Sequence, residues 1–348
     1  MKRVVSVIRV IPLTQRIFLI GFAWLMVLGV YINNLRYTPH GRLTLRSAII
    51  RQWLDDEPAS WTKRQLIDRR ARAHGDVYEL EPIAARKTIQ LPNCKVHLFK
   101  PTHSGRPLPV IIAYHGGGFF YDFVPMAEAY YRHLANQTGF LVVAPDYRVA
   151  PEHPFPAATN DSYETFKWVL ANIAREDGDP ARIAVWGDSA GGNLAAVVTQ
   201  KARDEGLTDA IDLQILVYPA VDMYSEESES FRKFGVGYIL SQASMEFIRN
   251  VYTAGADCRN PEISPLLHKN FGQLPPCLLV TAEFDPLHDQ AIAYAKRLEK
   301  AGIEVHHREF KGMLHGFVGP VDVFPHANDR FMEMAVEFLS VLKTKKRG

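Results

Sequence analysis

The chain of 348 residues has few cysteines, little net charge, and neither an internal repeat nor a low-complexity segment. Its three cysteines (Cys94, Cys258 and Cys277) are odd in number and widely spaced, which argues against a disulfide framework and a zinc site. A formal net charge of +2 gives no reason to expect a nucleic-acid partner. The hydrophobic fraction of 47% and charged fraction of 22% are typical of globular proteins, not of disordered ones. The length fits one large domain with insertions or two small domains.

Charge is also absent from residues 17–35, between Arg16 and Arg36. As a helix this stretch would be about 28 Å long, close to the hydrocarbon thickness of about 30 Å. Basic residues precede it, as in a signal anchor. We therefore expect residues 1–33 to be a transmembrane anchor, with the rest of the chain on the extracytoplasmic side. A cleaved signal peptide that leaves a secreted or periplasmic protein, and an apolar helix packed on the body of a cytoplasmic protein, are the alternatives.

Strand and helix patterns alternate after the polar residues 34–85. Mainly apolar runs predict buried strands at 109–114, 140–144, 183–186, 213–218 and 277–282. A short antiparallel strand is predicted at 96–99 and a further strand at 305–310. Helices are predicted at 126–136, from Asn160 or Asp161 to 173, and at 190–205, 289–301 and 328–343. Such strands, separated by helices, indicate a mostly parallel sheet covered on both faces, hence an α/β fold in residues 86–345. Residues 222–262 interrupt the pattern, and we expect them to form a cap together with 34–85.

Two glycine-rich turns follow predicted strands. The second, Gly187-Asp188-Ser189-Ala190-Gly191, has the Gly-x-Ser-x-Gly form of a nucleophile elbow, a sharp strand-to-helix turn that exposes a serine hydroxyl. The first, His115-Gly116-Gly117-Gly118, has the form of a loop that donates backbone N–H groups to an oxyanion. Either turn alone is a weak signal, and together they predict acyl-ester chemistry.

A serine nucleophile needs a histidine base and a carboxylate that orients the histidine. In sheets of this kind the chain order is serine, acid, histidine, each at the carboxyl end of a strand. Asp285 and His315 follow two predicted strands in this order, so they are the expected acid and base. Glu283 and Asp289 remain alternatives for the acid. His115 precedes the serine and belongs to the glycine loop.

The residues around the serine have separate expected tasks. Gly187 and Gly191 leave room where side chains would collide with a neighbouring strand and helix. Gly116 to Gly118 let the backbone approach the substrate and point N–H groups at the oxyanion. The Ala190 N–H adds a donor at a helix N-terminus, where the helix dipole favours negative charge.

These motifs, with Asp146-Tyr147-Arg148-Val149-Ala150-Pro151, Asp285-Pro286-Leu287 and His315-Gly316-Phe317, resemble the hormone-sensitive lipase family of α/β-hydrolases over residues 85–345. That family includes bacterial carboxylesterases and arylacetamide deacetylases. The resemblance implies an α/β-hydrolase fold with an eight-stranded, mostly parallel sheet and a helical cap. It also implies Ser189 as nucleophile, Asp285 as acid, His315 as base, and an oxyanion hole from the amides of Gly117, Gly118 and Ala190.

The function expected from the residues and the resemblance is hydrolysis of short- to medium-chain acyl esters through an acyl-enzyme, with no cofactor and no metal. The substrate would be a small-molecule ester, and a homodimer is possible. Deacetylation or amide hydrolysis, and lipase action, would use the same triad. A non-catalytic ligand-binding module on the same fold is disfavoured because His315 is present.

Overall fold

The computed structural model describes residues 13–52, 62–75, 79–103, 105–225 and 227–345 of the chain, without the side chains of residues 13–20, 22, 23, 63 and 75. One eight-stranded sheet organises the fold, in the order β10-β9-β8-β7-β5-β6-β4-β3. Its strands are β3 (Ala85–Gln90), β4 (Lys95–Lys100), β5 (Leu108–Tyr114), β6 (Leu141–Asp146), β7 (Gly178–Asp188), β8 (Leu213–Val217), β9 (Cys277–Phe284) and β10 (Val305–Leu314). The strands from β5 to β10 pair in parallel, whereas β4 is antiparallel to both β3 and β6. The mostly parallel eight-stranded sheet is as predicted.

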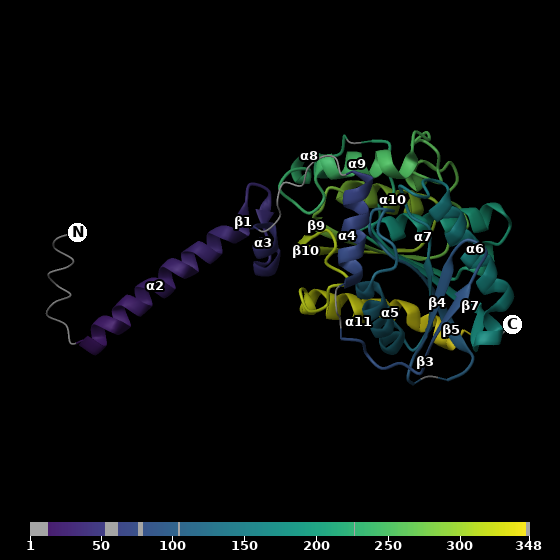
Figure 1. Cartoon of the computed structure of the whole chain (residues 1–348), viewed down its shortest axis with the longest axis horizontal. Coiled ribbons are helices and arrows are strands. Elements are labelled where there is room, and N and C mark those ends of the chain that lie inside the picture. Colours follow the sequence, from purple (N-terminus) through teal and green to yellow (C-terminus); the bar gives the residue numbers. More distant parts are fainter. Residues whose placement is uncertain (1–12, 53–61, 76–78, 104, 226, 346–348) are drawn as a thin grey trace.

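Helices cover both faces of the sheet (Figure 1). The side chains of β5 alternate between them: Val110 and Ile112 belong to one buried cluster, Ile111 and Ala113 to another. The first cluster includes residues of α6 (Ala157–Asn172), α7 (Ala190–Asp204) and α10 (His288–Lys300), and the second includes residues of α5 (Pro125–Thr138) and α11 (Pro325–Thr344). A strand buried on both faces needs a mainly apolar run of residues, so the inner strands could be predicted from the sequence.

The path of the chain reverses beside β5. After β5 the chain crosses to β6 on one side and then returns to β7 on the other, so β5 and β7 are neighbours. In open parallel sheets, ligands bind at the carboxyl ends of the strands where the strand order reverses. Tyr114 at the end of β5 is paired with Gly187 near the end of β7, so the two glycine-rich turns leave the sheet side by side.

Segments outside the sheet lie before β3 and between β8 and β9. The first contains the hairpin of β1 (Tyr37–Thr38) and β2 (Gly41–Arg42), and the helices α3 (Leu45–Gln52) and α4 (Lys63–Gly75). The second contains α8 (Glu229–Phe234) and α9 (Gln242–Thr253). Residues of α4 and α9 line the same cavity as Ser189.

Helix α2 (Leu13–Arg36) extends away from the body (Figure 1). Among residues whose side chains are described, no helix has the length and apolarity that crossing a membrane requires. The anchor predicted at residues 1–33 therefore lies partly outside the described residues, and its transmembrane character is unsupported within them.

One local prediction was wrong, and one strand was missed. Helix α6 begins at Ala157, before the predicted caps, and the Asp161 carboxylate instead accepts hydrogen bonds from the backbone and guanidinium of Arg148 at 2.8–2.9 Å. The edge strand β3 was not predicted, because most of its side chains are exposed and it has no apolar run.

Candidate active site

Ser189 lies at the tip of a strained turn between β7 and α7. Its backbone has φ 53° and ψ −117°, in a region that residues with side chains rarely adopt. The Ser189 N–H donates to the carbonyl of Val217 at 2.9 Å, and its carbonyl accepts from the Asn193 N–H at 3.1 Å. Backbone strain of this kind persists only where surrounding structure enforces it, and here bonds on both sides fix the hydroxyl in place.

Gly187 and Gly191 allow this turn to pack closely, as expected from the sequence. A Cβ at Gly187 would lie 2.0 Å from the carbonyl oxygen of Gly191, and a Cβ at Gly191 would lie 2.0 Å from that of Tyr114. These oxygens belong to backbone that cannot move aside. Any side chain at either glycine would therefore separate the elbow from β5 or from the start of α7.

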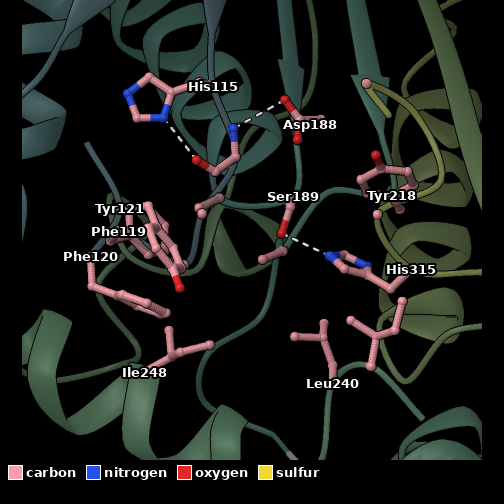
Figure 2. A pocket seen from close by; sticks show the side chains of 18 of the residues that line it. His115, Phe119, Phe120, Tyr121, Asp188, Ser189, Tyr218, Leu240, Ile248 and His315 are labelled. Carbon is pink, nitrogen blue, oxygen red and sulfur yellow. Dashed lines mark hydrogen bonds between the residues drawn. The ribbon is translucent and has the colours of Figure 1, made fainter. Parts of the chain in front are cut away.

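A continuous hydrogen-bond chain links Ser189, His315 and Asp285. The Ser189 Oγ lies 2.9 Å from His315 Nε2, and His315 Nδ1 lies 2.7 Å from Asp285 Oδ2. Figure 2 shows the imidazole facing the serine hydroxyl. Because an ionised carboxylate only accepts hydrogen bonds, His315 Nδ1 donates to Asp285 and Nε2 is left to accept from the serine.

The two competing acids have other partners. Glu283 Oε2 accepts from the Gly312 N–H at 2.7 Å, and Asp289 Oδ2 accepts from the Ser230 N–H at 2.8 Å. Asp285 is fully buried, and its second oxygen accepts from the Leu287 N–H at 2.8 Å. Of the three acids, Asp285 is therefore the one positioned to orient His315.

The loop that carries His315 is fixed by two residues that the sequence did not single out. The Tyr218 hydroxyl donates to the Val318 carbonyl at 3.1 Å, and its ring lies against the His315 ring at 4.6 Å. Burial raises the pKa of Tyr218, so the phenol keeps its proton. Asn328 on α11 donates to the Phe317 carbonyl at 2.9 Å. Tyr218 directly follows an apolar strand, and that position is the one signal that could have marked it.

Asp188 joins the two glycine-rich turns. Its Oδ1 accepts from the Gly116 N–H at 3.0 Å (Figure 2). Burial raises the pKa of the Asp188 carboxyl to about 6, although the Gly116 amide acts in the opposite direction. The prediction that Gly116 is an oxyanion donor was wrong, because its N–H is already engaged by this carboxylate.

Three predicted donors remain. The N–H groups of Gly117, Gly118 and Ala190 have no acceptor among the described residues. Ala190 is the first residue of α7, where the N–H groups lack intrahelical partners and the helix dipole favours an anion. These amides and Ser189 all line one cavity.

His115 supports the glycine loop from behind. It is buried, its ring stacks on that of Tyr147 at 4.2 Å, and its Nδ1 donates to the Gly116 carbonyl at 2.8 Å. Burial lowers the pKa of His115 to about 4, so the imidazole is neutral at neutral pH. Figure 2 shows His115 on the side of the glycine loop away from Ser189, which fits a supporting position rather than that of the base.

The cavity above Ser189 has a volume of about 510 Å³, within the range of small-molecule sites. Apolar and aromatic side chains form most of its lining, among them Phe119, Phe120, Leu240, Phe247 and Ile248. Within the described residues, no group of three or more histidine, cysteine, aspartate or glutamate side chains could hold a metal ion.

Several known proteins that this chain resembles are named as ester hydrolases. A protein-family profile described as alpha/beta hydrolase fold matches residues 111–319. Carboxylic ester hydrolase LipN of Mycobacterium tuberculosis is 38% identical over 63% of this chain and 60% of its own length. Ethyl acetate hydrolase of Pseudomonas putida is 32% identical over 71% of this chain and 83% of its own length. The solved structure of a thermostable esterase from Pseudomonas putida superimposes with a TM-score of 0.80 at 30% identity, covering 89% of this chain and all of that one.

The chain belongs to the α/β-hydrolase fold family, in the hormone-sensitive lipase-like group that its motifs predicted. It is a carboxylic ester hydrolase, and a serine esterase mechanism fits both its fold and its relatives.

Proposed function

We propose that Ser189 is the nucleophile, His315 the general base and Asp285 the residue that orients it. The observation that carries this proposal is the pair of hydrogen bonds at 2.9 and 2.7 Å that links the three side chains. A neutral imidazole that receives from serine and donates to a buried carboxylate can take the serine proton and remain stabilised once charged.

Acylation then runs as follows. Ser189 Oγ attacks the carbonyl carbon of the ester while His315 Nε2 takes the hydroxyl proton. The negative charge forms on the former carbonyl oxygen, and the N–H groups of Gly117, Gly118 and Ala190 stabilise it. Each such donor typically contributes about 2.7–4 kcal/mol to the transition state. The C–O bond breaks as His315 gives its proton to the departing alcohol, which leaves an acyl group on Ser189.

Deacylation uses the same groups in reverse. His315 Nε2 removes a proton from water, the resulting hydroxide attacks the acyl carbon, and the amides again hold the oxyanion. The bond to Ser189 Oγ breaks as His315 returns the proton to it, and a carboxylic acid is released.

The test is Ser189→Ala, with Ser244→Ala as its matched control because Ser244 lines the same cavity. We expect Ser189→Ala to lower kcat for p-nitrophenyl butyrate by about 10⁴-fold or more and to abolish labelling by a fluorophosphonate probe. Ser244→Ala should keep both. Labelling or turnover that survives in Ser189→Ala would remove Ser189 from the mechanism.

We propose short- to medium-chain acyl esters as substrates. Support comes from the apolar lining and from the wall formed by Phe120 and Ile248, which both approach Gly118 closely. Each added methylene that enters an apolar pocket gains about 0.8 kcal/mol, so kcat/KM should rise about fourfold per methylene until the pocket is full and then fall. A series of p-nitrophenyl esters from acetate to laurate measures this optimum, and a steady rise up to laurate would contradict it.

We also propose that residues 17–35 associate with a membrane and that the catalytic body lies on its extracytoplasmic side. Support comes from the uncharged sequence and from the exposed apolar side chains of α2. Fractionation of cells that express the full chain, followed by protease treatment of intact cells or spheroplasts, tests both statements. Recovery in the soluble fraction would refute the first, and protection from protease would refute the second.

A further inference from the structure

Helix α2 exposes apolar side chains on every side. Trp24, Leu25, Met26, Val27 and Leu28 are successive residues, and each is at least 51% exposed. Five successive residues cover more than one helical turn, so no face of this part of α2 rests on the protein. An apolar surface of this kind is favourable only in contact with another apolar phase.

A second group of exposed apolar side chains lies on β1, on α3 and on two loops that α3 contacts, and both β1 and α3 contact α2. We name it the collar and define it as Tyr37, Leu45, Ile49, Val236 and Val323, which are all exposed. Hydrogen bonds from α3 hold its parts together. Arg46 on α3 donates to the carbonyls of Asp322 and Val323 at 2.8 and 2.6 Å, and Arg51 donates to that of Gly237 at 3.0 Å.

Positive charge predominates around the N-terminal part of the collar, although the exposed Asp322 directly precedes Val323. Residues 1–54 contain eight lysines and arginines and no acidic residue. Arg42 is exposed and lies over the ring of Tyr37 at 5.5 Å, while Arg36, Arg46 and Arg51 lie on α2 and α3 around it. Arginines and a tyrosine beside apolar side chains are the composition of a protein surface at a lipid–water boundary.

We infer that the collar docks on the surface of an anionic membrane while α2 inserts among its lipids. A second copy of the chain is a poorer occupant. A symmetric contact would place the arginines of one collar against those of the other, and like charges at a contact are repulsive. Anionic lipid headgroups complement the arginines, and the acyl region beneath accepts the exposed apolar side chains.

The collar shares its loops with the catalytic cavity. The loop of Val236 continues to Ile239 and Leu240, and the loop of Val323 begins with Val318 and Pro320, and these four residues line the cavity. Docking therefore brings one wall of the cavity to the lipid boundary, where apolar esters concentrate. This last step rests on the proposed function, because it assumes that Ser189 acts in that cavity.

The end of α2 packs near the residues that precede the acid and the base of the triad. Leu35 at the end of α2 packs on a buried cluster that includes Leu43, Phe284 and Leu314. Phe284 and Leu314 directly precede Asp285 and His315 in the chain. The end of α2 thus packs together with the segments that lead into Asp285 and His315. The catalytic loops therefore keep a fixed position relative to the membrane.

The experiment places an environment-sensitive dye on the full chain. In a Cys258→Ser background, Val236→Cys and Val323→Cys carry the dye on the collar. Val341→Cys is the control, because it is 55% exposed near the C-terminal end of α11, on the side away from α2 (Figure 1). Cys94 and Cys277 are buried and protected from labelling. Vesicles of phosphatidylcholine with phosphatidylglycerol are the membrane, and a brominated lipid serves as the quencher.

We expect both collar dyes to brighten on vesicles and to be quenched by the brominated lipid, whereas the dye at position 341 should do neither. Collar dyes that stay in water while the protein floats with the vesicles would overturn the docking. A response that depends on protein concentration without vesicles would assign the face to a second copy instead. Hydrolysis of soluble p-nitrophenyl butyrate by the same labelled proteins tests the proposed function separately.

Arg42→Gln tests the charge. Removing one arginine near an anionic surface should weaken binding to anionic vesicles about fivefold. Binding to pure phosphatidylcholine and hydrolysis of p-nitrophenyl butyrate should stay unchanged. An equal loss on both kinds of vesicle would show that the arginines do not face the lipid.

Discussion

Replacing Asp188 with asparagine should make this enzyme more stable at neutral and alkaline pH. The carboxylate is half-buried between the two glycine-rich turns, where it accepts one hydrogen bond from the Gly116 N–H at 3.0 Å. An asparagine amide oxygen can accept the same bond without bringing a negative charge out of water. The substitution therefore removes the cost of a partly desolvated charge and keeps the link between the turns.

The magnitude and its pH dependence follow from the raised pKa. A rise from the ordinary 3.8 to about 6 corresponds to about 3 kcal/mol against the ionised form, an upper limit because Asp188 borders the cavity. Below about pH 4 both the folded and the unfolded chain hold this proton, so there is no cost. Between about pH 4 and 6 the folded chain alone holds it, and stability falls as pH rises. Above about pH 6 the full cost is present.

Urea unfolding of the wild type and Asp188→Asn at several pH values measures the effect, since other titrating groups cancel in the difference. The variant should be more stable by about 1–3 kcal/mol at pH 8, and the difference should shrink toward zero below about pH 4. Its kcat/KM should stay within about tenfold of the wild type. Asp188→Ala leaves the Gly116 N–H unpaired, at a cost of about 1–3 kcal/mol, and should lose about 10–100-fold in kcat/KM because the oxyanion loop is no longer held. A difference between wild type and Asp188→Asn that is independent of pH would refute this reasoning.

Three further predictions follow from single contacts. Asp285→Asn should lower kcat by about 10⁴-fold while circular dichroism stays unchanged, because the amide no longer selects the His315 tautomer that accepts from Ser189; a loss below tenfold would contradict the orienting role. Gly191→Ala should lower the free energy of unfolding by more than about 4 kcal/mol in urea, because its Cβ would lie 2.0 Å from the Tyr114 carbonyl oxygen. In the control Gly272→Ala the Cβ would meet nothing closer than 3.3 Å, so the loss of stability should be far smaller. Arg148→Gln should lower the free energy of unfolding by about 3–5 kcal/mol, because it leaves the fully buried Asp161 carboxylate without its charged partner. Adding Asp161→Asn should restore part of this stability, and no recovery would contradict an unpaired charge as the cause.

Elements that are buried on both faces could be predicted from the sequence. Strand β5 is a continuous apolar run because helices cover it on both sides, and burial selects such residues. Strand β3 pairs only with β4 and carries exposed Arg86 and Lys87, so neither its composition nor its period marks it. The sequence thus predicts the centre of the sheet better than its edge.

The start of a helix could not be predicted where a residue distant in sequence binds the expected capping side chain. Asp161 has the side chain of a helix cap, and in isolation it could have capped a helix that starts there. Arg148 binds that carboxylate with three hydrogen bonds, and the helix begins four residues earlier. The pairing of Asp161 with Arg148, 13 positions earlier in the chain, therefore prevents Asp161 from capping the helix. A local sequence pattern does not reveal such a contact.

The two glycine-rich turns of the candidate site could be predicted from the sequence, but the contact between them could not. Each glycine-rich turn carries its own short motif, because close backbone packing and exposed amides need glycine at fixed spacing. The turns become neighbours through the pairing of β5 with β7, which joins Tyr114 to Gly187 across a reversal of the chain. Asp188 then binds Gly116, which removes one expected oxyanion donor and fixes the loop that carries the others. The half-buried acid beside the nucleophile is therefore best explained as the residue that holds the oxyanion loop in position next to Ser189.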